Sequence, residues 1–222
     1  MISNEIQLLL FTAASIGFFH TLFGPDHYLP FIVLAKARRW SLPKTTWVTV
    51  ACGLGHVGSS VFLGILGIAL GVGVNRLVGI ESVRGSIAGW LFIAFGLVYL
   101  VWGIRKAYRN KPHKHIHVHN DGSYHTHQHV HQENHVHVHE NRRKQVTPWV
   151  LFVIFILGPC EPLIPILMYP AAQNSTTGLI LVTLVFGLAT LFTMLSIVLV
   201  STFGINFLPL GKLERYTHAI AG

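Results

Sequence analysis

The sequence predicts an all-α, polytopic membrane protein, because its composition, its long apolar segments and an internal repeat all indicate membrane-spanning helices. Of the 222 residues, 51% are hydrophobic and only 11% are charged, whereas an ordinary soluble domain has about 25% charged residues. The charges gather between apolar blocks, and a transmembrane helix needs about 20 mainly apolar residues. We expect five spans, at residues 6–35 with an interruption, 46–72, 86–104, 148–170 and 178–203.

An internal repeat divides the chain into two related halves. The segment "GPDHYL" at residues 24–29 recurs in altered form as "GPCEPL" at 158–163, and two later pairs of segments keep almost the same offset. Each half would hold three spans, and because three is an odd number the second half is expected to be inverted in the membrane. The domains predicted are a first repeat at 1–108, a loop at 109–146 and a second repeat at 147–222. The second repeat stops before its third helix, so a sixth helix is expected to be missing from the chain.

The positive charges predict the orientation. Fourteen of the 16 Lys and Arg residues follow the first span, lie between spans three and four, or follow the fifth span, and only Arg76 and Arg84 fall in the loop between spans two and three. Cytoplasmic loops carry the excess of positive charge. We therefore expect an integral protein of a bacterial-type plasma (inner) membrane, with its N-terminus outside and the loop 109–146 in the cytoplasm. Because the basic residues border helix ends, the net charge of +8 is assigned to topology and no nucleic-acid partner is expected.

A Gly-Pro pair interrupts the first and the fourth span at matching positions of the repeat. Proline removes a backbone hydrogen bond from a helix, and such breaks survive in a membrane only where they are buried in protein or line a wet cavity. Matched broken helices therefore indicate a binding site near the middle of the bilayer. Ionisable side chains stand at the breaks and on the second span, and imidazole and carboxylate groups suit a transition metal. The candidate metal ligands are His20, Asp26, His27, His56, Glu161 and Cys160.

These motifs also carry a resemblance to a known family. "HTLFGPDH" at residues 20–27 is similar to the His-x4-Asp-His signature of nickel/cobalt transporters, with one extra residue, and "GLGHVGSS" at 53–60 resembles their second signature. The likeness covers most of the chain and is greatest to the urease-accessory UreH-like membrane proteins. It implies transport of a divalent cation, Ni2+ or Co2+ first and Zn2+ or Fe2+ as other candidates. The ion would be cargo, so neither a prosthetic group nor an enzymatic activity is expected.

A second segment favours a different function. "LGPCEPLIP" at residues 157–165 resembles the Pro-Cys segment of membrane thiol-disulfide electron carriers, which use a pair of cysteines. The counterpart of Cys160 in the first break is Asp26, so a cysteine pair across the repeat is absent. The only other cysteine is Cys52. Thiol-disulfide electron transfer, and a metal-binding accessory or sensor protein, stay open as alternatives to transport.

The loop between spans three and four holds most of the histidines in alternating His-x-His runs. Alternation is compatible with a strand, but the loop is poor in apolar residues, so we expect no fixed structure until it binds a ligand. Imidazole is the commonest protein metal ligand, so the loop is predicted to gather metal ions, with pH sensing as the alternative. The expected partners are the bilayer, a divalent metal ion, a cytoplasmic metallochaperone and further copies of the chain. The histidines concerned are His113, His115, His117, His119, His125, His127, His129, His131, His135, His137 and His139.

Overall fold

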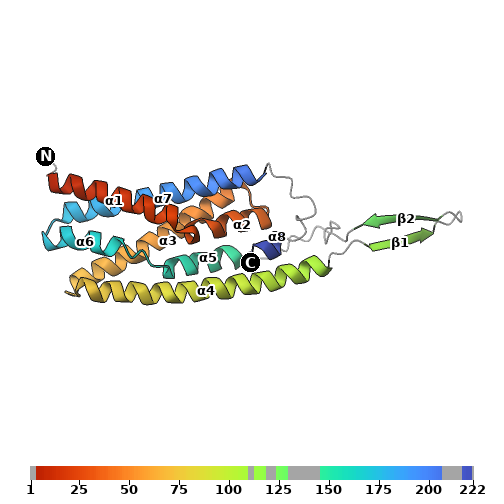
Figure 1. The fold of residues 1–222 in the computed structure, drawn as a ribbon, viewed down its shortest axis with the longest axis horizontal. Helices are drawn as coiled ribbons and strands as arrows, with labels where there is room; N and C mark the ends of the chain where they lie inside the picture. Colours follow the sequence, from red (N-terminus) through yellow and green to blue (C-terminus); the bar gives the residue numbers. More distant parts are fainter. Residues whose placement is uncertain (1–3, 110–112, 119–123, 130–145, 207–216, 222) are drawn as a thin grey trace.

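The structure is a computed structural model that describes residues 4–109, 113–118, 124–129, 146–206 and 217–221. Four helices of the described part are long and apolar enough to cross a membrane, at Asn4–Phe23, Leu42–Ala69, Val74–Tyr108 and Thr176–Gly204. They lie along one common direction as an elongated bundle (Figure 1). The prediction of a helical, polytopic membrane protein is thereby confirmed.

The first span is broken where the sequence predicts it. Helix α1 (Asn4–Phe23) ends at the Gly-Pro pair, a 3-10 turn η1 (Pro25–His27) follows, and α2 (Leu29–Ala37) continues the chain. The backbone N–H of Gly24 donates to the carbonyl of His20 at 3.0 Å, and the N–H of His27 donates to the carbonyl of Gly24 at 3.0 Å. Pro25 has no N–H to give to the helix, so the chain tightens into this turn.

Helices α3 (Leu42–Ala69) and α4 (Val74–Arg109) follow, and α4 corrects one prediction. The third span was expected at 86–104, with a loop before it that carries Arg76 and Arg84. The structure instead makes this loop the first turns of α4. The charges that suggest a loop are accommodated inside the bundle, because Arg84 pairs with Glu81 one helical turn away.

The second break also divides a predicted span. Residues 148–170 are two short helices, α5 (Val146–Leu157) and α6 (Leu163–Ala172), which are joined by an irregular segment at 158–162. The long helix α7 (Thr176–Asn206) follows, and α8 (Thr217–Ile220) is a single turn against α4. The described helices thus repeat one order twice, namely a broken helix followed by a long helix.

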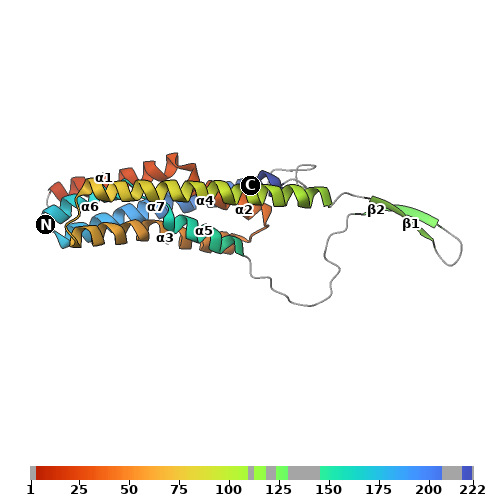
Figure 2. The same cartoon turned by 90° about the horizontal axis from the view of Figure 1, so that it is seen from below.

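Helix α7 packs along α1 in both views of the bundle (Figures 1 and 2). A Cβ on Gly17 of α1 would stand 3.0 Å from the carbonyl oxygen of Phe186 on α7, so the absent side chain lets the two backbones approach. Buried apolar clusters surround both breaks, one including Phe31 and Phe155 and the other Cys160 and Phe186. Each break is therefore buried in part, at His27 and at Cys160, whereas Asp26 and Glu161 are exposed.

The outer surface of the bundle is apolar. Large side chains such as Phe11 (73% exposed), Phe192 (74%) and Trp90 (71%) point away from the core. Exposed apolar surface on this scale marks an interaction site, and together with the long apolar helices it implies contact with lipid. The chain is an integral membrane protein that contacts the bilayer.

The histidine-rich loop contains a β-hairpin, which corrects the expectation that it has no fixed structure. Strands β1 (His113–Val118) and β2 (Tyr124–His129) pair antiparallel and lie beyond the end of α4 (Figure 1). The alternating sequence is compatible with a strand ladder, and the register sets His113 opposite His129, His115 opposite His127 and His117 opposite His125. The fold is thus helical with one small hairpin. Five of the predicted loop ligands lie outside the described residues, namely His119, His131, His135, His137 and His139.

Candidate metal site at the first helix break

Three histidines converge at the first break. The ring centroids of His20 and His27 lie 4.7 Å apart, and those of His27 and His56 lie 4.9 Å apart, each pair edge to face. One nitrogen from each ring lies within 4.8 Å of one from each of the others. Among the described residues, this is the group of metal-ligating side chains that the structure brings together.

The break itself makes this convergence. His20 lies in the last turn of α1 and His27 in the 3-10 turn that follows, and Nδ1 of His27 lies 3.1 Å from the carbonyl oxygen of Gly24. His56 comes from the middle of α3. His27 and His56 are buried, at 3% and 5% exposed, and His20 is partly buried. Three separate segments thus hold the cluster.

The imidazoles present free nitrogen atoms to one another. Nδ1 of His27 lies 3.1 Å from the carbonyl oxygen of Gly24 and 3.3 Å from Oδ1 of Asp26. Since these oxygens only accept, Nδ1 carries the hydrogen and Nε2 of His27 keeps its lone pair. The Nε2 atoms of His20, His27 and His56 are all buried and have no hydrogen-bond partner in the described part of the chain. Buried polar atoms without partners are rare, and three in one place indicate a ligand.

The donor set fits a transition-metal ion. Imidazole nitrogens bind such ions at about 2.0–2.1 Å, so tetrahedral ligand atoms stand about 3.4 Å apart. The present limit of 4.8 Å would have to shorten on binding of an ion. An imidazole set suits zinc, copper, iron or nickel, and a carboxylate or carbonyl that fixes the ring tautomer is the usual outer partner of a ligating histidine.

A cavity leads to the cluster from the surface. It has a volume of about 520 Å³, and His20 lines it together with Phe19, Gly24 and Pro162. His20 therefore belongs both to the cavity wall and to the cluster. An ion could reach the cluster along this side without crossing the buried core.

The other candidate ligands lie elsewhere. The side chain of Asp26 is 66% exposed and reaches the cluster only through Nδ1 of His27. Glu161 is exposed, and the structure does not bring it to the histidines. Cys160 is fully buried within the second apolar cluster. A role of these three residues as direct metal ligands stays a prediction.

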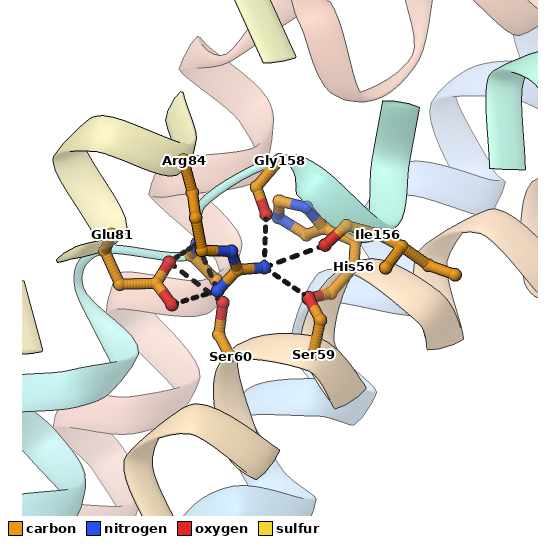
Figure 3. A network of polar contacts seen from close by, with 8 residues as sticks. His56, Ser59, Ser60, Glu81, Arg84, Ile156 and Gly158 are labelled. Atoms are coloured by element: carbon orange, nitrogen blue, oxygen red, sulfur yellow. Dashed lines mark hydrogen bonds and ion pairs between the residues drawn. The ribbon is translucent and has the colours of Figure 1, made fainter. Parts of the chain in front are cut away.

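The structure also contains a buried polar network at the second break, which was not predicted from the sequence (Figure 3). Glu81 is completely buried, and it pairs with Arg84 beside the broken segment. Both residues fall in the segment 73–85 that was expected to be a loop, so the charge of Arg84 was assigned to topology and Glu81 was not a candidate. An i,i+3 spacing of opposite charges next to an apolar block is the signal that could have found them.

The two cysteines are free and buried and lie apart. Cys52 and Ser60 are two helical turns apart on α3, roughly 12 Å along its axis at about 1.5 Å per residue. The backbone N–H of Cys160 donates to Oγ of Ser60 at 3.1 Å, so Cys160 stands near the Ser60 end. A disulfide needs Cα atoms within about 7 Å, so Cys52 and Cys160 cannot form one without backbone movement.

Comparison with known proteins gives one family. The family described as the cytochrome c biogenesis protein transmembrane region matches residues 29–219, whereas no curated protein and no solved structure matches the chain. This family consists of thiol-disulfide transporters. The assignment to nickel/cobalt transporters was therefore wrong, and so was the transport function that the resemblance implied.

The source of this error lies in the motifs used. The signature "HTLFGPDH" ends at His27, just before the matched residues begin. The matched residues include α3, α4 and the second break with its Pro-Cys segment, which had suggested the alternative of thiol-disulfide chemistry. Because the match covers most of the chain, the protein belongs to the family of cytochrome c biogenesis transmembrane regions.

Proposed function

We propose that this member of the family is a metal-binding membrane protein whose histidine cluster, His20, His27 and His56, holds one transition-metal ion within the bilayer. One observation carries the proposal: three imidazoles meet at a helix break with one nitrogen of each within 4.8 Å of the others, and each ring has a buried Nε2 atom without a partner in the described part of the chain. Leaving them unpaired costs free energy in a low-dielectric interior, and a cation would satisfy all three at once. The proposal concerns binding, and it assigns no movement of the ion across the membrane.

The position of the family match supports a specialised site. The match begins at residue 29 and so includes His56 but not His20 or His27. Two of the three ligands therefore stand on the N-terminal helix and turn, outside the matched part. The family points to electron transfer, and imidazole-bound copper or iron can change its oxidation state.

Thiol-disulfide electron transfer through Cys160 is a second candidate, and the match to the family specifically favours it. Cys160 lies at a Gly-Pro break inside the matched residues. Because Cys52 is too far away for a disulfide, the second thiol would come from a partner protein. Cys160 is fully buried, so this chemistry also requires the break to open.

The finer topology belongs to the same proposal. The repeated order of broken helix and long helix supports an inverted repeat, and the distribution of positive charges supports an N-terminus outside and a histidine-rich loop in the cytoplasm. Three pairs of histidines stand opposite one another in the register of the hairpin. Such a strand pair would collect metal ions near the membrane.

The test is metal binding by the purified full-length chain in detergent, with the eleven loop histidines replaced by glutamine so that the loop cannot compete. Titration with Cu2+, Zn2+, Co2+ and Ni2+ should give one bound ion per chain for at least one metal. His27→Ala should abolish this binding, and Cys160→Ser should leave it unchanged. Equal binding by His27→Ala would contradict the proposal, and loss of binding in Cys160→Ser would favour a thiolate site.

A further inference from the structure

An ion pair on α4 supplies hydrogen bonds that the second break removes from a helix (Figure 3). Nη2 of Arg84 donates to the carbonyl oxygens of Ile156 at 2.7 Å and Gly158 at 3.4 Å, and Nη1 donates to the carboxylate of Glu81. The last four carbonyls of a helix have no partner within it, and α5 ends at Leu157. Arg84 thus satisfies the backbone at the point where α5 stops.

The carboxylate of Glu81 binds the backbone further along the break, at Cys160. Oε2 of Glu81 accepts the backbone N–H of Cys160 at 3.0 Å and the hydroxyl of Ser60 at 3.1 Å. Arg84 also donates to Oγ of Ser59 at 2.7 Å. Since Ser59 and Ser60 belong to α3, the pair joins three segments: α3, α4 and the break.

The broken segment at 158–162 also lies close to His56, one of the three cluster histidines. A Cβ on Gly158 would stand 3.2 Å from Nδ1 of His56, and a Cβ on Gly85 would stand 2.8 Å from Cγ of Pro159. The broken segment therefore packs closely between α4 and the His56 ring. Figure 3 shows the ring of His56 beside the Gly158 carbonyl that Arg84 binds.

We propose that Arg84 and Glu81 are positioning residues for the histidine cluster. By fixing the backbone at Gly158 they hold the His56 ring in place, so that its Nε2 faces His20 and His27. Ionisable side chains within membrane segments are costly and mark functional sites. This pair reaches His56 through the break and also through Ser59, whose hydroxyl donates to the His56 carbonyl at 2.9 Å. The inference rests on the proposed function of the cluster as a metal site.

The test compares Arg84→Gln with Arg76→Gln in the full-length chain with the eleven loop histidines replaced. Arg76 is an exposed arginine on the same helix and serves as the matched control. Co2+ is the probe, because its visible absorption reports coordination geometry. Arg84→Gln should weaken Co2+ binding 10- to 100-fold, as loss of an outer partner of a ligand usually does, and should change the spectrum. Arg84→Lys should recover part of the affinity, and Arg76→Gln should match the parent chain.

A second experiment needs no metal and measures how accessible Cys160 in the second break is to a thiol reagent. In a Cys52→Ser background Cys160 is the only thiol, and it is fully buried. N-ethylmaleimide should therefore label it slowly in the parent chain and faster in Arg84→Gln, because the break is no longer fastened to α4. An unchanged labelling rate would contradict the claim that Arg84 holds the break.

Gly158→Ala tests the same geometry with the ion pair intact. The added methyl group must displace the His56 ring by a few tenths of an ångström, so the Co2+ spectrum should change, whereas Gly58→Ala, which meets open space, should not change it. Parent-like affinity and spectra in both Arg84→Gln and Gly158→Ala, in protein shown to be folded by circular dichroism, would overturn this inference alone. Absence of Co2+ binding in the parent would overturn it together with the metal site.

Discussion

The imidazole ring of His27 lies edge-on to that of His56, with the ring centroids 4.9 Å apart, and both Nε2 atoms are buried without a partner in the described part of the chain. His27 occupies this position from the 3-10 turn after Gly24, and His56 occupies it from the middle of α3. The first helix break therefore brings histidine side chains close together. It exposes ligand atoms to one another inside a bundle whose outer surface is apolar.

Asp26→Asn should weaken metal binding about tenfold, because the carboxylate near Nδ1 of His27 supports the tautomer that leaves Nε2 free. Glu161→Gln is the matched control, since Glu161 is also an exposed carboxylate beside a Gly-Pro break. It should bind metal like the parent chain. Isothermal titration of both variants measures the difference, and equal loss in both would point to a general effect of surface charge.

Mild oxidation with diamide should not join Cys52 to Cys160. Cys160 lies beside Ser60, which is roughly 12 Å along α3 from Cys52, and a disulfide needs Cα atoms within about 7 Å. Intact-mass measurement after oxidation should therefore show no loss of two hydrogens. Rapid loss of two hydrogens would show that the break moves far enough for thiol chemistry, and it would favour the Cys160 function.

Phe186→Ala should lower the free energy of unfolding by about 3 kcal/mol, because a fully buried aromatic side chain leaves a cavity when truncated. Phe186, on α7, is 0% exposed and belongs to the buried apolar cluster that also includes Cys160. Phe192 lies on the same helix at 74% exposed, so Phe192→Ala should change stability by less than about 0.5 kcal/mol. Denaturant unfolding in one detergent compares the two, and equal destabilisation would contradict the burial of Phe186.

The docking of α8 should weaken in acid. Burial, together with the charges of Lys106 and Arg38, lowers the pKa of His218 from 6.5 to about 4. Nζ of Lys106 donates to Nε2 of His218 at 3.1 Å, and Nδ1 of His218 lies 3.0 Å from the Tyr99 hydroxyl. A protonated Nε2 cannot accept from Lys106.

Because the pKa is lower when α8 is docked, the undocked segment binds the proton first. The contribution of His218 is therefore complete above pH 6.5 and is lost as the pH falls toward 4. Hydrogen exchange at residues 217–221 should accelerate between these values in the parent chain. His218→Asn removes the titrating group, so its exchange, corrected for intrinsic rates, should lose this dependence. A parent chain whose corrected exchange is flat over the same range would exclude the mechanism.

The sequence predicts much of this fold because its signals are local. Gly24-Pro25 and Gly158-Pro159 remove backbone hydrogen bonds wherever they stand, so both breaks were predictable. The spans follow from apolar length. The start of α4 was missed because hydropathy treats Glu81 and Arg84 as solvent-exposed charges, whereas in the bundle they satisfy each other and the backbone of a distant segment.

The site was predictable in its residues but not in its chemistry. His20, His27 and His56 were all candidates from their place in apolar spans, and the structure brings these three together. Similar motifs at a helix break occur in more than one family, and "HTLFGPDH" outweighed the Pro-Cys segment that lies within the matched residues. The separation of Asp26, Glu161 and Cys160 from the cluster depends on turn geometry that no local pattern specifies.

X-ray absorption of the metal-loaded chain, with the loop histidines replaced, tests the central claim most directly. At one equivalent of metal, three imidazole nitrogens should surround the ion at about 2.0–2.1 Å. The count should fall by one in His56→Ala wherever binding persists. An oxygen-only or sulfur-containing shell, or the same imidazole count in His20→Ala, His27→Ala and His56→Ala, would contradict a metal site built from these three histidines.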